Sequence, residues 1–266
     1  MQYLFDAWQI IVDKIRTASH TLFMFDFDGT LTPIVDTPEM AELHEESREL
    51  LKSLARCSNS TVAIISGRAI NDLQSKIGIP GIIYAGNHGL EIQGPDLAFV
   101  HPITEEVGPV VRMVALLLKK ALGAIRGAIV EDKGLTLSVH YRLVDDQEVD
   151  EVKDILDSTV GLAAVLGKVR TSSGKMVHEI RPAVPWNKGK AVKLLMKRYG
   201  KGGWQSGLLP IYVGDDLTDE DAFQVIENYG GVTVYVGGEN HQSSASYYLK
   251  STGEVANLIK ELLRLN

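Results

Sequence analysis

The sequence predicts an α/β protein: a doubly wound, mostly parallel sheet with a smaller α+β domain inserted into it. Two observations carry this prediction. Short runs that are apolar on both faces alternate with helical patterns at both ends of the chain, which is typical of a parallel sheet covered by helices on each side. Between them the pattern changes to helix, two strands, helix, two strands, which indicates an antiparallel sheet with two helices on one face.

The core is assigned to residues 1–103 and 185–266 and the inserted domain to residues 104–184, with prolines 102, 182 and 185 as hinge candidates. In the first part of the core, an N-terminal helix is expected at 3–18. Apolar runs and helical spacing then predict strands at 21–27, 61–66 and 81–86 and helices at 44–57 and 68–77.

The same apolar runs and helical spacings predict the helices and strands in the rest of the chain. The inserted domain is expected to contain a helix at 104–122, a strand pair within 127–142, a helix at 146–159 and strands at 162–171 and 175–182. The core then resumes with helices at 187–200, 218–230 and 253–265 and strands at 208–216 and 232–237.

Composition limits the class of protein. The chain has 266 residues, 45% of them hydrophobic and 23% charged, with a single cysteine, Cys57. One cysteine excludes an internal disulfide framework. A net charge of −7 argues against a nucleic-acid partner, and the lack of a basic leader or a long apolar run predicts a cytoplasmic protein with no membrane partner. We expect a monomer, while the helix at 3–18 could pack on the core or mediate association.

Polar residues follow three of the predicted core strands. They are Asp26 and Asp28 after the first strand, Ser66 and Arg68 after the second, and the Asp215–Asp216 pair after the strand at 208–216. In an open parallel sheet, ligands bind beyond the carboxyl ends of the strands. Clustered carboxylates repel one another, so a divalent cation is expected here, and oxygen ligands favour Mg²⁺.

These residue types fit the hydrolysis of a phosphoester. Asp26 can attack phosphorus and form an aspartyl-phosphate, and Asp28 can act as general acid and then general base. Lys188 and Ser66 can hold phosphoryl oxygens. The alternative is ordinary turn chemistry, because aspartate also favours loops after strands. For Glu220 and Asp221 we favour such a structural role at a helix start.

Four segments, in order, resemble the motifs of the haloacid-dehalogenase (HAD)-like phosphohydrolases: "DFDGTLTP", "IISGR", "NKGKA" and "GDDLTDED". The resemblance covers the core and implies a HAD-like Rossmannoid fold. It implies Asp26 as nucleophile, Asp28 as acid/base, Ser66 and Lys188 as phosphate-binding residues and Asp215 as metal ligand. It also implies that Asp26 and the Asp28 carbonyl bind Mg²⁺, with Asp216 and Asp219 as outer or occasional direct ligands.

The first strand pair of the inserted domain carries a polar face. With a turn at Lys133–Gly134, Glu131 would lie opposite Thr136. One face would then hold Ile129, Glu131, Lys133, Thr136, Ser138, His140 and Arg142, and the other Val130, Leu135, Leu137, Val139 and Tyr141. The apolar face suits the two helices. The polar face can be a plain solvated surface, or it can donate to and accept from the hydroxyls of a sugar.

Three further segments resemble the trehalose-6-phosphate phosphatases: "YAGNHGLEI", "EDKGLTLSVHYR" and "KMVHEIRP". This resemblance extends over nearly the whole chain. It implies that the inserted domain is a cap and that Glu131, Lys133 and Glu179 bind sugar hydroxyls. Further candidates for substrate binding are Arg68, Asn87, His88, His140 and Arg142, with a capping or core role as the alternative for His88.

The expected function is therefore Mg²⁺-dependent hydrolysis of trehalose 6-phosphate in trehalose biosynthesis, with a phosphorylated disaccharide as the partner molecule. Three alternatives stay open. The substrate could be another sugar phosphate, such as sucrose 6-phosphate or a glycosyl-3-phosphoglycerate. The chain could also be a non-catalytic sugar-phosphate sensor, or a phosphomutase that protects its aspartyl-phosphate from water.

Overall fold

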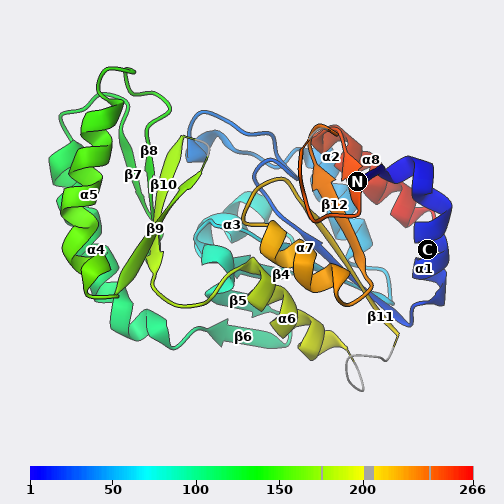
Figure 1. Ribbon diagram of the computed structural model, residues 1–266. Coiled ribbons are helices and arrows are strands. Elements are labelled where there is room, and N and C mark those ends of the chain that lie inside the picture. Colours follow the sequence, from blue (N-terminus) through cyan, green and yellow to red (C-terminus); the bar gives the residue numbers. More distant parts are fainter. Residues whose placement is uncertain (175, 201–206, 240, 266) are drawn as a thin grey trace. The chain divides into compact units, whose positions relative to one another are not determined.

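The computed structural model describes residues 1–174, 176–200, 207–239 and 241–265. The chain divides into two compact units (Figure 1). Unit 1 is Met1–Phe99 with Trp186–Asn266, and unit 2 is Val100–Pro185, inserted between the two halves of unit 1.

Unit 1 is built on a nine-stranded sheet with the order β1-β13-β12-β11-β2-β3-β4-β5-β6. Neighbouring strands from β1 to β4 pair in parallel. The predicted doubly wound, mostly parallel fold is thereby confirmed. The strands are β1 (Gln2–Tyr3), β2 (His20–Phe25), β3 (Ser60–Ile65), β4 (Ile83–Gly86), β5 (Glu91–Gly94), β6 (Leu97–Val100), β11 (Leu208–Gly214), β12 (Val232–Val236) and β13 (Tyr247–Leu249).

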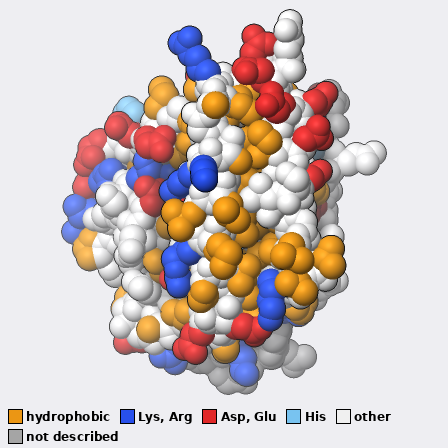
Figure 2. Space-filling model, turned by 90° about the vertical axis from the view of Figure 1, so that its left-hand side faces the viewer, with side chains coloured by type: hydrophobic (Ala, Val, Ile, Leu, Met, Phe, Trp, Pro, Cys, Tyr) orange, Lys and Arg blue, Asp and Glu red, His pale blue; other side chains and the backbone are white. Residues whose placement is uncertain are grey.

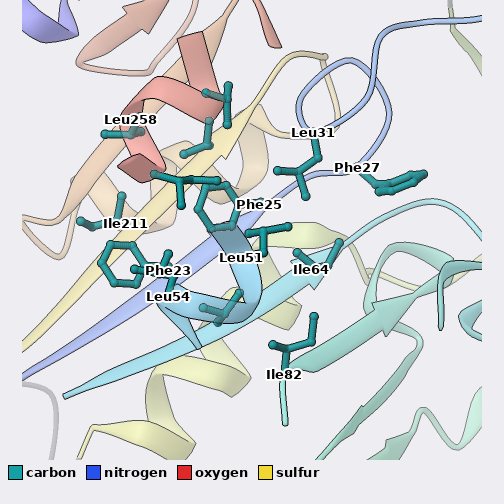
Figure 3. Close-up of a cluster of buried hydrophobic side chains, with 14 of the residues drawn as sticks. Phe23, Phe25, Phe27, Leu31, Leu51, Leu54, Ile64, Ile82, Ile211 and Leu258 are labelled. Atoms are coloured by element: carbon teal, nitrogen blue, oxygen red, sulfur yellow. The ribbon is translucent and has the colours of Figure 1, made fainter. Parts of the chain in front are cut away.

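Helices cover both faces of this sheet because successive residues of each strand point to opposite sides. Phe23 and Phe25 of β2 pack with α2 and α8, as Figure 3 shows, whereas Leu22 and Met24 pack with α6 and α7. The helices of unit 1 are α1 (Trp8–Thr17), α2 (Glu45–Leu54), α3 (Ile70–Ile77), α6 (Lys188–Tyr199), α7 (Glu220–Glu227) and α8 (Thr252–Leu263), with short 3-10 turns η1 (Leu4–Ala7), η2 (Pro38–Met40) and η3 (Asn87–Gly89).

One edge of the sheet differs from the sequence prediction. After β4 the chain turns through η3 and returns as β5, which pairs with β4 antiparallel, and β6 follows at the sheet edge. The segment 91–100 was not predicted as strand. Its two strands are four residues each, too short to show a clear alternation of apolar and polar positions.

Unit 2 contains a four-stranded antiparallel sheet with the order β7-β8-β10-β9. Apolar side chains of its strands pack with those of two helices in one cluster. No helix in the described ranges has the length and apolarity needed to cross a membrane. The elements are α4 (Ile103–Leu122), β7 (Ile129–Asp132), β8 (Leu137–His140), α5 (Val149–Val165), β9 (Val169–Gly174) and β10 (Val177–Pro182).

The predicted strand at 162–171 was partly wrong. Residues 162–165 form the last turn of α5, and β9 begins only at Val169. The run Leu-Ala-Ala-Val is apolar without a strand-like alternation. It continues the helix because the buried positions Val152, Leu156 and Val160 before it recur every four residues.

Candidate active site

The candidate site lies at the carboxyl ends of three adjacent strands of unit 1. Strands β11, β2 and β3 are neighbours in the sheet. Asp26 follows β2 directly, Ser66 follows β3, and Asp215 follows β11. All three are buried. Because these strands run in parallel, the polar residues that the sequence predicted at three separate places share one edge of the sheet.

Lys188 joins two of these carboxylates. It is the first residue of α6, and its side chain is 2% exposed. The Nζ atom lies 3.1 Å from Asp26 Oδ1 and donates to Asp219 Oδ1 at 2.7 Å. An ammonium group at the positive end of a helix is unfavourable by itself. The two buried carboxylates offset that cost and hold the cation in place.

Asp219 organises the acidic loop after β11. Its Oδ1 also accepts from the Tyr212 hydroxyl at 2.6 Å, and its Oδ2 accepts from the backbone N–H groups of Asp215 and Asp216 at 3.0 and 3.1 Å. Asp219 approaches so closely that a Cβ atom on Gly214 would lie 2.4 Å from its carboxyl carbon. Both Asp219 oxygens are therefore engaged in holding the loop and Lys188.

Burial shapes the ionisation of the central pair. Burial raises the pKa of Asp26 well above its ordinary value; Lys188 opposes this, and the carboxylates of Asp219, Asp216 and Asp215 add to it. Burial alone would lower the pKa of Lys188, but Asp219 and Asp26 raise that pKa well above its usual range. Lys188 therefore supplies a positive charge next to Asp26, and this charge favours the carboxylate form of Asp26 against the effect of burial.

The donor set fits a divalent cation. One carboxylate oxygen each from Asp26, Asp216 and Asp219 lies within 4.8 Å of the other two. Burial raises the pKa of Asp26 and repulsion from the neighbouring carboxylates adds to the rise; a cation would relieve this repulsion. Oxygen-only donors are the ligands that Mg²⁺ prefers. In the described chain this trio does not include Asp215, a predicted metal ligand.

Asp215 instead lies against the turn that follows Asp26. Its carboxylate would be 2.2 Å from a Cβ atom on Gly29, which has a positive φ of 84°. The Thr30 hydroxyl donates to Asp215 Oδ1 at 3.4 Å. Gly29 is therefore required both for the left-handed turn and for the close approach of this carboxylate.

Asp28, the predicted acid/base, is paired with Arg68. Arg68 Nε donates to Asp28 Oδ2 and Nη2 to Oδ1, both at 2.7 Å. Arg68 also donates to Asp72 at 2.8 Å and to the carbonyl of Pro38 at 3.1 Å. In this structure Arg68, predicted to bind substrate, positions Asp28.

Ser66, Asn87 and His88 belong to one backbone arrangement. Ser66 Oγ accepts from the N–H of Arg68 at 3.2 Å, and the N–H of His88 donates to the Ser66 carbonyl at 2.9 Å. Asn87 and His88 both have positive φ, 51° and 57°, which is unfavourable for residues other than glycine. Such strain is retained where the surroundings require it. The Asn87 side chain donates to Glu91 Oε2 at 3.0 Å.

In unit 2, polar residues predicted to contact the sugar share one face of the sheet. Glu131, Ser138, Glu179 and Ser172 are direct partners across β7, β8, β10 and β9, so their side chains point the same way. We call this the polar sheet face. The alternate residues, including Leu137, Val139 and Ile180, pack with α4 and α5 on the other side.

Ion pairs and hydrogen bonds connect this polar sheet face. Glu131 Oε2 lies 2.8 Å from His140 Nε2 and 3.6 Å from Lys133 Nζ, and Lys133 also donates to Ser138 Oγ at 2.8 Å. Arg181 Nη2 lies 3.2 Å from Glu179 Oε2 and donates to the Ser172 hydroxyl at 2.8 Å. The face therefore holds two charged clusters, each with its own glutamate.

The predicted register of the β7–β8 pair was wrong by two residues. Glu131 lies opposite Ser138, not Thr136, because the turn spans four residues, closed by a hydrogen bond from Lys133 N–H to the Thr136 carbonyl. A shift of two preserves the side on which each residue points, so the predicted polar face survives. β8 ends at His140, so Arg142 lies in the next turn and not in the strand as predicted.

Known proteins resemble this chain over nearly its full length. The family model for trehalose-phosphatase matches residues 24–253. That range includes the sheet-edge residues of unit 1 and all of unit 2. The chain belongs to the trehalose-phosphatase family.

One relative and one solved structure with trehalose-phosphate phosphatase names resemble this chain, and a third protein shares its fold. The probable trehalose-phosphate phosphatase 3 of Oryza sativa is 35% identical over 277 residues, covering 97% of this chain and 74% of that protein. The C-terminal domain of the Candida albicans trehalose-6-phosphate phosphatase has a TM-score of 0.83 at 25% identity, with 97% of each chain covered. A haloacid dehalogenase-like hydrolase of Bacteroides thetaiotaomicron shares the fold, with a TM-score of 0.60 at 18% identity and 91% and 99% covered.

Sequence reasoning missed three supporting residues of this trehalose-phosphatase family member. They are Tyr212, which donates to Asp219, Asp72, which holds Arg68, and Arg181, which holds Glu179. Tyr212 lies in a buried strand and is indistinguishable by sequence from a core tyrosine. Asp72 is four residues from Arg68 at the start of α3, a spacing that allows a pair on a helix and was the one available signal.

Proposed function

We propose that the chain is an Mg²⁺-dependent phosphatase that hydrolyses trehalose 6-phosphate to trehalose and phosphate, as a step of trehalose biosynthesis. The observation that carries the proposal is the buried Asp26–Lys188–Asp219 arrangement at the end of β2. A match to the trehalose-phosphatase family that continues through unit 2 supports the substrate.

In the first step, an Asp26 carboxylate oxygen attacks phosphorus. The new oxygen–phosphorus bond forms as the ester bond to the sugar oxygen breaks, and Asp28 donates a proton to that oxygen. Both Asp28 oxygens accept hydrogen bonds from Arg68, so at least one of these bonds must open before Asp28 delivers a proton.

In the second step, water replaces Asp26 on phosphorus. Asp28, now a carboxylate, accepts a proton from the attacking water, and the bond between phosphorus and the Asp26 oxygen breaks. Phosphate leaves, the Asp26 carboxylate is restored, and Asp28 again carries the proton. No other reactant is needed.

Two cationic or hydroxyl donors remain for the phosphoryl oxygens. Lys188 donates one hydrogen to Asp219 and forms an ion pair with Asp26, so its ammonium group retains a hydrogen for the substrate. Ser66 Oγ accepts from the Arg68 backbone, so its own hydroxyl hydrogen can be donated. Both groups lie in a buried setting, where a hydrogen bond to an anion is strong.

Asp26 and Asp216, two members of the carboxylate cluster, are proposed to hold Mg²⁺. The family resemblance adds Asp215 and the Asp28 carbonyl as proposed ligands. When bound, the ion would supply positive charge against the phosphoryl oxygens and favour the carboxylate form of Asp26. Asp219, the third member of that cluster, is proposed as an outer ligand that mainly positions the loop, because its oxygens already accept hydrogen bonds from Lys188, Tyr212 and two backbone N–H groups.

Unit 2 is proposed to be a cap whose polar sheet face recognises the sugar. Glu131, Lys133 and Glu179 are the residues proposed to bind its hydroxyls, with His140 beside Glu131. Charges that are only partly buried and already hydrogen-bond one another can exchange a partner for a hydroxyl at small cost. Asn87, His88 and Arg142 are proposed as further contacts.

The proposal is tested by phosphate release with Mg²⁺ and with a chelator. The substrates are trehalose 6-phosphate, sucrose 6-phosphate, mannosyl-3-phosphoglycerate, glucose 6-phosphate and an aryl phosphate. A metal-dependent preference for trehalose 6-phosphate is expected. A different preference would retain the Asp26 chemistry and reject the role of the polar sheet face. Tight binding without release would reject catalysis and favour a sensor.

A further inference from the structure

Helices α4 and α5 of unit 2 expose apolar side chains on the face that points away from the sheet of unit 2. On α4, Met113 is 61%, Leu116 70% and Leu117 49% exposed, and the C-terminal end of α5 adds Leu162, Val165 and Leu166 at 72%, 85% and 62%. We call these six residues the outer patch. Figure 2 shows apolar side chains gathered on this side of the molecule. Contiguous exposed apolar surface marks an interaction site.

The outward side of α4 repeats every seven residues. Glu106, Met113 and Lys120 are spaced by seven, with Pro109 and Val110 in the first interval and Leu116 and Leu117 in the second. Val110 is half-buried and lies at the border of this side, where it also packs on the core of unit 2. Val107, Val111, Val114 and Leu118 of the same helix are buried against unit 2. The helix thus has one apolar stripe toward its own domain and a second that faces outward, with the heptad spacing of a helix–helix seam.

We propose that the outer patch binds a second copy of this chain, with the two α4 helices antiparallel about a two-fold axis at Met113. In such a contact residue i meets residue 226 − i, as an isologous interface requires. Met113 then meets its own counterpart, and Pro109 and Val110 meet Leu117 and Leu116. Glu106 meets Lys120 of the second copy, and the reverse pair repeats this at the other end.

The charge pattern identifies a second copy as the occupant. An apolar stripe with an acid at one end and a base at the other, equidistant from its centre, is complementary to its own antiparallel image. Glu106 is 60% exposed and its Oε1 accepts from Lys168 at 2.5 Å, which leaves Oε2 for the second copy. Lys168 follows α5, so this contact also places the apolar end of α5 beside the N-terminal end of the seam.

This dimer differs from the monomer expected from the sequence, and it leaves each proposed site intact. The acidic cluster and Lys188 come from unit 1 of a single chain. The polar sheet face lies on the opposite side of the unit 2 sheet from α4 and α5. A second copy on the helices therefore leaves that face accessible, and loss of the dimer tests the interface independently of the proposed phosphatase activity.

Sedimentation velocity across micromolar concentrations tests the proposal with the full chain. We expect a concentration-dependent dimer. Met113→Lys, which sets two cations face to face on the axis, should raise the dimer dissociation constant by roughly a hundredfold or more. Ile10→Lys is the matched control: Ile10 is 53% exposed on α1, outside the patch, and its substitution should leave the dimer unchanged. Circular dichroism checks that both variants fold.

The second test reverses the charges at Glu106 and Lys120 and measures self-association of the variants. Glu106→Lys and Lys120→Glu should each weaken self-association, whereas a mixture of these two variants should form a heterodimer because both cross-pairs become attractive. The double variant should recover self-association, and Lys168→Ala controls for the pair within one chain. A monomeric wild-type chain, a dimer that tolerates Met113→Lys, or two single variants that fail to associate on mixing would overturn the proposal.

Discussion

The two polar regions of this molecule use charge in different ways. At the sheet edge of unit 1, Asp26, Lys188 and Asp219 are 7%, 2% and 0% exposed. On the polar sheet face of unit 2, Glu131, His140 and Glu179 remain about one-fifth exposed. Buried charges are costly to displace and suit a reaction that needs fixed geometry. Charges that keep some exposure to solvent can exchange partners, which suits recognition of hydroxyl groups.

Replacing the proposed nucleophile should have the largest effect. Asp26→Asn keeps the size of the side chain and removes the attacking carboxylate, so phosphate release should fall by at least about 10⁴-fold. The loss should be equal for trehalose 6-phosphate and an aryl phosphate, because Asp26 attacks the phosphorus atom that both substrates share. Residual turnover within tenfold of the wild type would assign the nucleophile elsewhere.

Removing the buried ammonium group of Lys188 should lower the stability of the protein. Lys188→Met leaves Asp26 and Asp219 without their cation, and the free energy of unfolding should fall by about 3–5 kcal/mol. Lys190→Met is the matched control two residues along α6, at an exposed position, and should change that free energy by less than about 0.5 kcal/mol. Urea unfolding of both variants provides the measurement. Equal stability would mean that the pairs at Lys188 are not structural.

A change on the polar sheet face should separate the two substrates. Glu131→Gln should lower kcat/KM for trehalose 6-phosphate by about 10- to 100-fold, because that is the effect of losing a hydrogen bond to a charged group. The kcat/KM for the aryl phosphate should not change. Asp132→Asn alters the adjacent, exposed residue, whose side chain points to the other face and caps Gly134 through an oxygen that asparagine retains. It should have no effect. Equal losses on both substrates would exclude a sugar-specific role for Glu131.

The smallest effect is expected at Asp72. Asp72→Asn weakens one contact of Arg68 and retains both hydrogen bonds from Arg68 to Asp28. Because Asp72 is 40% exposed, the pair contributes little, and kcat/KM should fall by only about two- to fivefold on either substrate. A drop beyond a hundredfold would show that the guanidinium group depends on both acids.

The sequence predicted the parts of this structure that local pattern determines. Strands β2, β3 and β11 are continuous apolar runs, and each ends in polar residues, so both the parallel sheet and the edge that carries the candidate site could be inferred. The order of elements in unit 2 could be inferred for the same reason. Turn length could not, so the register of β7 and β8 was two residues off while the faces were correct.

The sequence could not predict which residues, far apart in the chain, contact one another. The bond between Asp28 and Arg68 joins residues 40 positions apart, and that between Lys188 and Asp219 joins residues 31 apart. Each residue type alone fits several partners, and the sheet order that brings these together is known only from the fold. Tyr212 shows the same limit, because its hydroxyl contact with Asp219 depends on how the loop after β11 folds back.

In the proposed mechanism, unit 1 acts on the phosphoryl group and unit 2 selects the sugar. Rapid acid quench with ³²P-labelled trehalose 6-phosphate and a labelled aryl phosphate tests it most directly, in the wild type and in Glu131→Gln. We expect label on Asp26 from both substrates, with its formation slowed by Glu131→Gln for trehalose 6-phosphate alone. Label on another residue, or equal slowing with both substrates, would contradict it.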